Sequence, residues 1–138
     1  MRNRRKAVVV LLAVLLVAGV AYWTSPRVLF DDADSLQIYR ITAVGAAEES
    51  RDITDAVDIA VLQQGLQGLD CGRVPVFMEH YALADVRYEV DGHYQGESFH
   101  IIVGRINYVY GGAGQGYYEL RGGEELVELL DRLTGSSE

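Results

Sequence analysis

Residues 7–23 read AVVVLLAVLLVAGVAYW, and this apolar, uncharged stretch determines how the rest of the chain is arranged. At about 1.5 Å per helical residue it spans roughly 25 Å, close to a hydrocarbon core of about 30 Å. Four basic residues lie in the segment 1–6, and no basic cluster follows the stretch. The positive-inside bias therefore predicts a cytoplasmic tail at 1–6, a lipid-embedded anchor at 7–23 and a C-terminal domain outside the cell membrane.

The same stretch also fits a cleaved signal peptide, because small residues such as Ala18 and Ala21 offer a cleavage site. Tyr22 and Trp23 favour the uncleaved anchor, since aromatic side chains concentrate at membrane interfaces. Cleavage would instead give a secreted protein. The single cysteine, Cys71, excludes an intrachain disulfide and could join two chains into a homodimer.

The chain of 138 residues is long enough for one exported domain with its own core. We expect a linker at 24–34, the domain at 35–134 and a tail at 135–138. From Thr24 onward, eight arginines are opposed by twenty carboxylates, a net charge of −12. Such an acidic surface should repel nucleic acid, so nucleic acid is not an expected partner.

The first half of this domain predicts one strand and one helix. Residues 36–44, LQIYRITAV, are rich in strand-forming side chains. A helix capped by Asp52 or Thr54 should then run to about Leu69, with apolar residues at helical spacing. We expect at most a short edge strand in residues 74–84, because Pro75 cannot donate to a central ladder.

The second half predicts an antiparallel meander and a closing helix. Residues 86–90 alternate apolar and charged side chains, and Asp91-Gly92 reads as the following turn. Residues 98–110 should form two strands broken near Gly104, and 117–120 a further one. The helix at 121–133 places four leucines on one stripe: Leu126, Leu129, Leu130 and Leu133. The expected fold is a two-layer α+β domain, strand-helix-strands-helix, with both helices on one sheet face.

Several segments resemble small exported or membrane-anchored α+β domains of Gram-positive bacteria. The resemblance lies in the segment ESFHIIVG at 97–104, in NYVY at 107–110, in GYYEL at 116–120 and in the closing GGEELVELLDRL. Ile53-Thr54-Asp55 after a first strand is similar to the same group. The resemblance implies an envelope location and an α+β fold, and it implies no active site.

No stretch of the sequence carries a catalytic motif, and we expect neither an enzyme nor a cofactor. His80, His93 and His100 could serve a small metal-dependent hydrolase, of which His93 and His100 could meet across a hairpin. Their spacing matches no known metal-ligand pattern. The glycines at 111, 112, 114 and 116 lack the lysine and following helix of a phosphate loop, which indicates a hairpin loop.

Tyrosines are concentrated in the meander, and exposed tyrosine beside glycine is typical of binding surfaces. We expect Tyr108 and Tyr110 to be core residues if Ile106 packs inward, since the three share a side of a strand. The expected contact surface is then exposed at the hairpin end: Tyr94, Tyr117, Gly111, Gly112, Gly114 and Gly116. The predicted function is a non-enzymatic, protein- or peptide-binding module of the cell envelope. An accessory subunit of a larger membrane transporter or sensor is the alternative to it and to the hydrolase.

Overall fold

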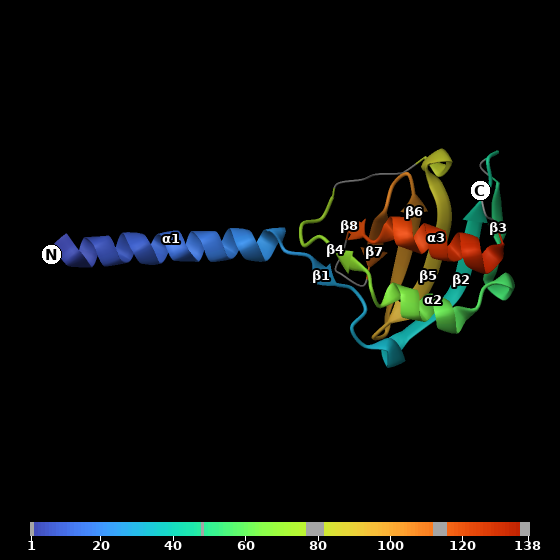
Figure 1. The fold of residues 1–138 in the computed structure, drawn as a ribbon, viewed down its shortest axis with the longest axis horizontal. Helices are drawn as coiled ribbons and strands as arrows, with labels where there is room; N and C mark the ends of the chain where they lie inside the picture. The colour runs from blue at the N-terminus through green and yellow to red at the C-terminus, as the bar shows by residue number, and fades with distance from the viewer. Residues whose placement is uncertain (1, 48, 77–81, 112–115, 136–138) are drawn as a thin grey trace.

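The computed structural model describes residues 2–47, 49–76, 82–111 and 116–135. It consists of a long N-terminal helix, α1 (Arg2–Thr24), that projects from an α+β domain (Figure 1). No side chain of α1 is buried, and the helix is long and apolar enough to cross a membrane, a test that signal sequences also pass. The predicted class, a candidate membrane helix followed by an α+β domain, is confirmed.

One antiparallel sheet of eight strands forms the domain, in the order β1-β4-β8-β7-β6-β5-β2-β3. Its long strands are β2 (Leu36–Val44), β5 (Val86–Tyr94) and β6 (Glu97–Gly104), followed by β7 (Tyr108–Gly111) and β8 (Tyr117–Arg121). The alternating residues at 86–90 and the break after Gly104 thus form strands where the sequence predicts them. Short strands complete the edges: β1 (Arg27–Val28), β3 (Ser50–Asp52) and β4 (Asp70–Cys71).

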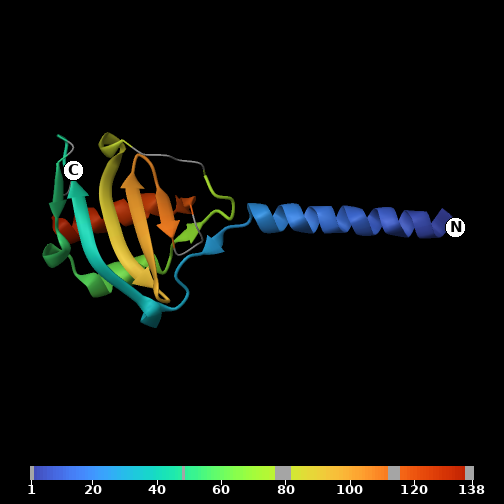
Figure 2. The ribbon, with the colours of Figure 1, turned by 180° about the vertical axis from the view of Figure 1, so that it is seen from behind.

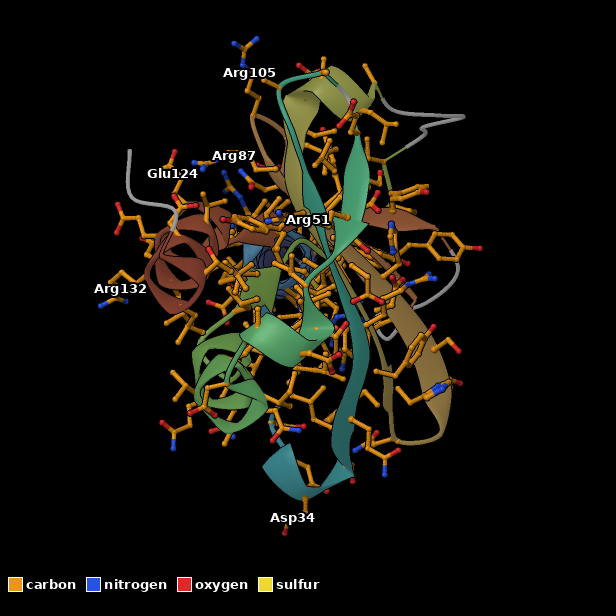
Figure 3. The ribbon with its side chains drawn as sticks, turned by 90° about the vertical axis from the view of Figure 1, so that its right-hand side faces the viewer. Asp34, Arg51, Arg87, Arg105, Glu124 and Arg132 are labelled. Carbon is orange, nitrogen blue, oxygen red and sulfur yellow. The ribbon has the colours of Figure 1, made fainter. Side chains whose placement is uncertain are left out.

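Two helices, α2 (Ile59–Leu66) and α3 (Gly123–Thr134), cover one face of the sheet (Figures 1 and 3). Leu126 and Leu130 of α3 are buried against the core, as the leucine stripe predicts. The opposite face, seen from behind in Figure 2, has no described helix over it. We call it the open face. Three single 3₁₀ turns, Ala33–Ser35, Thr54–Ala56 and Leu83–Asp85, connect the elements.

The helix after β2 starts later than predicted. Thr54–Ala56 is a separate 3₁₀ turn, and the Asp58 carboxylate caps α2 by accepting from the amides of Ala60 and Val61 at 3.1 and 3.4 Å. Asp52 instead accepts from the Thr54 amide, and the Thr54 hydroxyl accepts from the amide of Ile41 in β2. The two predicted caps thus hold the turn against the sheet.

The predicted turn at Asp91-Gly92 is wrong. Strand β5 runs on to Tyr94, and the hairpin turns at Gln95-Gly96, both with positive φ, as in a type I′ turn. Gly92 lies inside β5, where no side chain fits. A Cβ there would come within 2.5 Å of the Phe99 ring and 2.4 Å of the Gln37 carbonyl oxygen. The glycine therefore leaves space for the Phe99 ring.

The predicted linker at 24–34 is folded from Arg27 onward. Strand β1 pairs with β4, and Leu29 and Phe30 are both buried. The Phe30 ring packs against Tyr94 and Phe99, with centroids 5.1 and 4.8 Å away. Only Ser25 and Pro26 lie between α1 and the sheet, so the domain begins at Arg27 rather than at residue 35.

Candidate functional site

A row of five polar and aromatic side chains crosses the open face of the sheet. The strand register places Arg40 opposite Asp91, Asp91 opposite His100, His100 opposite Tyr110, and Tyr110 opposite Tyr117. Because side chains alternate between faces, most neighbours of these residues in each strand are buried toward the helices. Tyr39 is an exception, because the register of β2 shifts between Ile38 and Arg40. We call these five residues the cross-strand row.

Asp91 is the centre of the row and the one buried charged residue of the described chain. Its Oδ2 lies 3.2 Å from Nε of Arg40, and its Oδ1 lies 2.6 Å from Nδ1 of His100. The hydrogen bond from Arg40, with the attraction of the Asp91 charge, raises the pKa of Arg40. Both carboxylate oxygens are therefore used, which offsets the cost of burying a charge.

His100 lies between two carboxylates. Beyond its bond to Asp91, its Nε2 is 3.8 Å from Oε1 of Glu89, which is too far for a hydrogen bond. This arrangement fixes the orientation of the imidazole ring in the sheet. The polar side chains at the centre of the row therefore bond one another and do not line a pocket.

Aromatic rings flank this polar centre on both sides. Tyr110 and Tyr117 pack with centroids 5.0 Å apart, and Tyr110 is 46% exposed. Toward the other end of β5, Tyr39 is 52% exposed and packs on His93 with centroids 5.1 Å apart. Ile102 also faces this side and is fully buried, and among the described residues the large exposed apolar side chains of this face are Tyr39 and Tyr110.

Tyr108 and Tyr110 are expected in the core only if Ile106 packs inward, and Tyr110 is instead 46% exposed. Val109 is the fully buried residue of β7, and it pairs with Ile101 and Tyr118, which are also buried. Tyr110 consequently points to the open face. Strand β7 begins at Tyr108, so the alternation inside it cannot be extended back to Ile106.

The sequence predicts Tyr94 on an exposed contact surface, whereas the structure buries it, leaving 6% exposed. Its hydroxyl donates to the Asp31 carboxylate and accepts from the Asp32 amide at 3.1 Å. The bond to Asp31, followed by burial, raises the pKa of Tyr94. Tyr94 thus ties the segment after β1 to the core and is unsuited to binding a partner directly.

The other predicted contact residues lie near the β7–β8 connection. Tyr117 is half-buried in the cross-strand row, as described above. Gly111 has a φ of +75°, and a Cβ there would come within 2.3 Å of the Ser98 carbonyl oxygen, so this glycine is required by the backbone. Gly116 also has a positive φ. Gly112 and Gly114 lie outside the described residues.

The histidines are placed in separate pairs. His93 lies opposite Ser98, with its Nδ1 3.2 Å from the Ser98 hydroxyl, whereas His100 lies opposite Asp91. His80 lies outside the described residues. Within the described ranges, no group of three or more histidine, cysteine or acidic side chains could hold a metal ion. Cys71 is fully buried, so its thiol does not lie on a surface where two chains could join.

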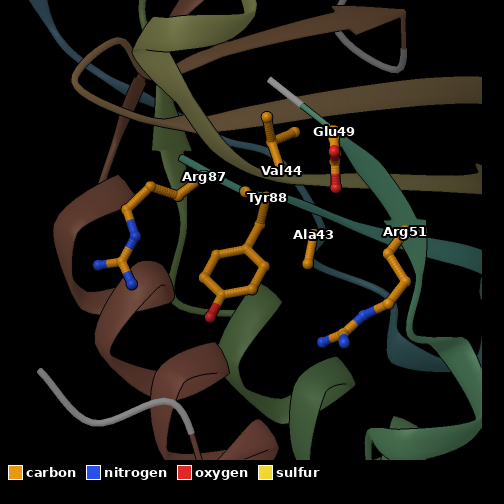
Figure 4. Close-up of a pocket in the computed structure, with 7 residues that line it drawn as sticks. Ala43, Val44, Glu49, Arg51, Arg87 and Tyr88 are labelled. Carbon is orange, nitrogen blue, oxygen red and sulfur yellow. The ribbon is translucent and has the colours of Figure 1, made fainter. Parts of the chain in front are cut away.

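A cleft of about 300 Å³ opens at the far end of the sheet from α1, on the helix side (Figure 4). Arg87 holds both oxygens of Asp131 at 3.1 and 2.9 Å, and the Tyr88 hydroxyl donates to Asp131 at 2.6 Å. Burial, with this bond, raises the pKa of Tyr88. These contacts join α3 to β5. The cleft is lined by Ala43, Val44, Gly45, Glu49, Arg51, Arg87 and Tyr88.

Sequence reasoning missed the Asp91–His100 pair because it placed the hairpin turn too early. With the turn at Gln95-Gly96, a two-residue hairpin sets Asp91 opposite His100 and His93 opposite Ser98. The signal was Gly96, which a type I′ turn needs at its second position.

Comparison with known proteins adds no assignment to this geometry. No protein-family model matches the chain, and no curated protein or solved structure matches it.

Proposed function

We propose that this chain is a membrane-anchored, extracytoplasmic binding module that contacts a protein or peptide of the cell envelope through the open face of its sheet. Helix α1 supports the anchor, because its apolar side chains are exposed and need lipid around them. The basic residues of the segment 1–6 support a cytoplasmic N-terminus.

The exposed tyrosines of the open face carry the proposal. Tyr39 and Tyr110 are about half exposed on a surface that no described helix covers. Tyrosine gives a large contact area with few rotatable bonds, so it adds affinity at low entropic cost. Asp91 and its partners lie between the two rings and offer a fixed polar pattern for orientation.

Binding is favoured over catalysis because the polar groups of the row are already engaged with one another. Both oxygens of Asp91 have partners, and the partly exposed side chain of Arg40 is one of them. We therefore favour a module that binds a partner and catalyses no reaction itself.

Photo-crosslinking in the cells that make the protein tests this function. Benzoylphenylalanine is placed at Tyr110 or Tyr39, and at Val61 of α2 as the control, which is exposed on the helix side. We expect the two open-face positions to give the same discrete adduct, absent at Val61. Mass spectrometry of the adduct then separates a peptide or envelope protein from a larger transporter or sensor. Adducts that are absent at both tyrosines, or equally strong at Val61, would contradict the open-face surface.

A further inference from the structure

The connection between α1 and the sheet is too short to lift the domain away from a membrane. Helix α1 ends at Thr24 and β1 begins at Arg27. The four residue steps from Trp23 to Arg27 reach at most about 14 Å, whereas the headgroup layer on one side is about 5–8 Å thick. If Trp23 lies at the interface, β1 starts within or just above the headgroups.

A direct contact joins the end of α1 to the domain. The Arg73 guanidinium carbon lies 4.1 Å from the centre of the Tyr22 ring, a cation–π contact. Arg73 follows β4, and β4 pairs with β1, so the same corner of the sheet holds both connections (Figure 1). This contact and the two-residue connection place this corner of the sheet beside the end of α1.

Exposed apolar side chains gather at this corner. Val28 of β1 is 54% exposed and Val74, just after Arg73, is 59% exposed; Val76 nearby is exposed as well. Outside α1, the other large exposed apolar side chains of the described chain are Tyr39, Val61 and Tyr110. Half of this set thus lies beside the end of the anchor.

The charge of the corner is opposite to that of the domain. Arg27 and Arg73 lie here, and Arg121 of β8 pairs in register with Asp70 of β4. These three arginines lie together, although the chain from Thr24 onward has a net charge of −12. A lipid phosphate matches the positive charge of these arginines.

We propose that the β1–β4 edge of the domain rests on the phospholipid surface, with Val28 and Val74 among the headgroups and Arg27 and Arg73 against lipid phosphates. This inference rests on the proposed membrane anchoring by α1. The sheet then stands on its β1 edge, and β3, at the other end of the strand order, lies farthest from the bilayer. The open face is held upright, accessible from the side.

Fluorescence quenching of the full chain in nanodiscs of phosphatidylcholine and phosphatidylglycerol tests this contact. A bimane label is attached to Val74→Cys, or to Arg51→Cys on β3 as the matched control, and the lipids carry a nitroxide at the headgroup. Wild-type protein is the labelling blank, because its Cys71 is fully buried. We expect several-fold stronger quenching at position 74 than at position 51. The double variant Arg27→Glu/Arg73→Glu should reduce the quenching at position 74 toward that at position 51.

Equal quenching at the two positions in protein that stays with the nanodisc would overturn the edge contact and leave the anchor intact. Quenching at position 74 that the charge reversal does not change would overturn the phosphate contact. Protein that leaves the nanodisc during gel filtration would instead contradict anchoring by α1, and the edge contact with it.

Discussion

Gly92 shows how a single missing Cβ sets the position of a ring in the core. Replacing it with alanine would place a methyl group 2.4 Å from the Gln37 carbonyl oxygen and against the Phe99 ring. Because one of these atoms is backbone, we expect Gly92→Ala to lower the free energy of unfolding by about 1–3 kcal/mol in urea titration. Gly72→Ala is the control, since nothing lies within 4 Å of the position that its methyl group would take, and it should change stability by less than about 0.5 kcal/mol. Equal effects would refute this role.

Tyr94 connects a local hydrogen bond to the pH dependence of stability. Its pKa is raised in the fold, so its contribution is fully present below the unfolded value of about 10 and is lost as the pH rises through the folded value. Tyr94→Phe removes the bonds to Asp31 and Asp32 and should cost about 1–2 kcal/mol at neutral pH. The difference from wild type should shrink above about pH 10 in denaturant titrations. A difference that stays constant to higher pH would contradict this assignment.

The side on which each tyrosine lies was only partly predictable. Inside β5 the alternation predicts Val86, Tyr88 and Val90 on one face, and all three are buried. Ile106 could not show which side chains of β7 face the helices, because that residue precedes the strand. The burial of Tyr94 could be predicted only with the hairpin turn at its true position. The Asp91-Gly92 pair is typical of a turn and placed the predicted turn too early.

Long elements followed from the sequence, and short ones did not. Strand β2 has the predicted bounds, and α3 presents the predicted leucine stripe. Strands β1, β3 and β4 have only two or three residues, too few to show an alternation, and they exist because neighbouring strands pair with them. The same limit hid the candidate membrane-facing edge, which is made of β1, β4 and the residues after β4.

The segment after β1 is predicted as a linker, but in the structure it forms part of the core. Phe30→Ala should lower the free energy of unfolding by about 3–5 kcal/mol, because the ring is buried between Tyr94 and Phe99. The control Val28→Ala, at an exposed position of β1, should stay within about 0.5 kcal/mol. Denaturant titration of the full chain in detergent gives both values. A small effect of Phe30→Ala would restore the linker interpretation.

Across the whole molecule, an apolar helix and an acidic α+β domain are joined by two residues, Ser25 and Pro26. The sheet ends in the short strands β1 and β3, which leaves little free edge for pairing with other chains. The proposed orientation places one of these edges at the lipid surface and leaves the open face for a partner. All of this depends on α1 crossing the membrane with the domain outside.

Cysteine accessibility in intact cells tests that central claim most directly. Ser50→Cys on β3 and Asn3→Cys near the start of α1 are treated with a membrane-impermeant maleimide, and wild-type protein with its buried Cys71 is the blank. We predict that Ser50→Cys in the membrane fraction is labelled in intact cells, whereas Asn3→Cys is labelled only after the cells are permeabilised. Labelling of Asn3→Cys but not Ser50→Cys in intact cells, or recovery of the domain as a soluble protein without α1, would contradict the account.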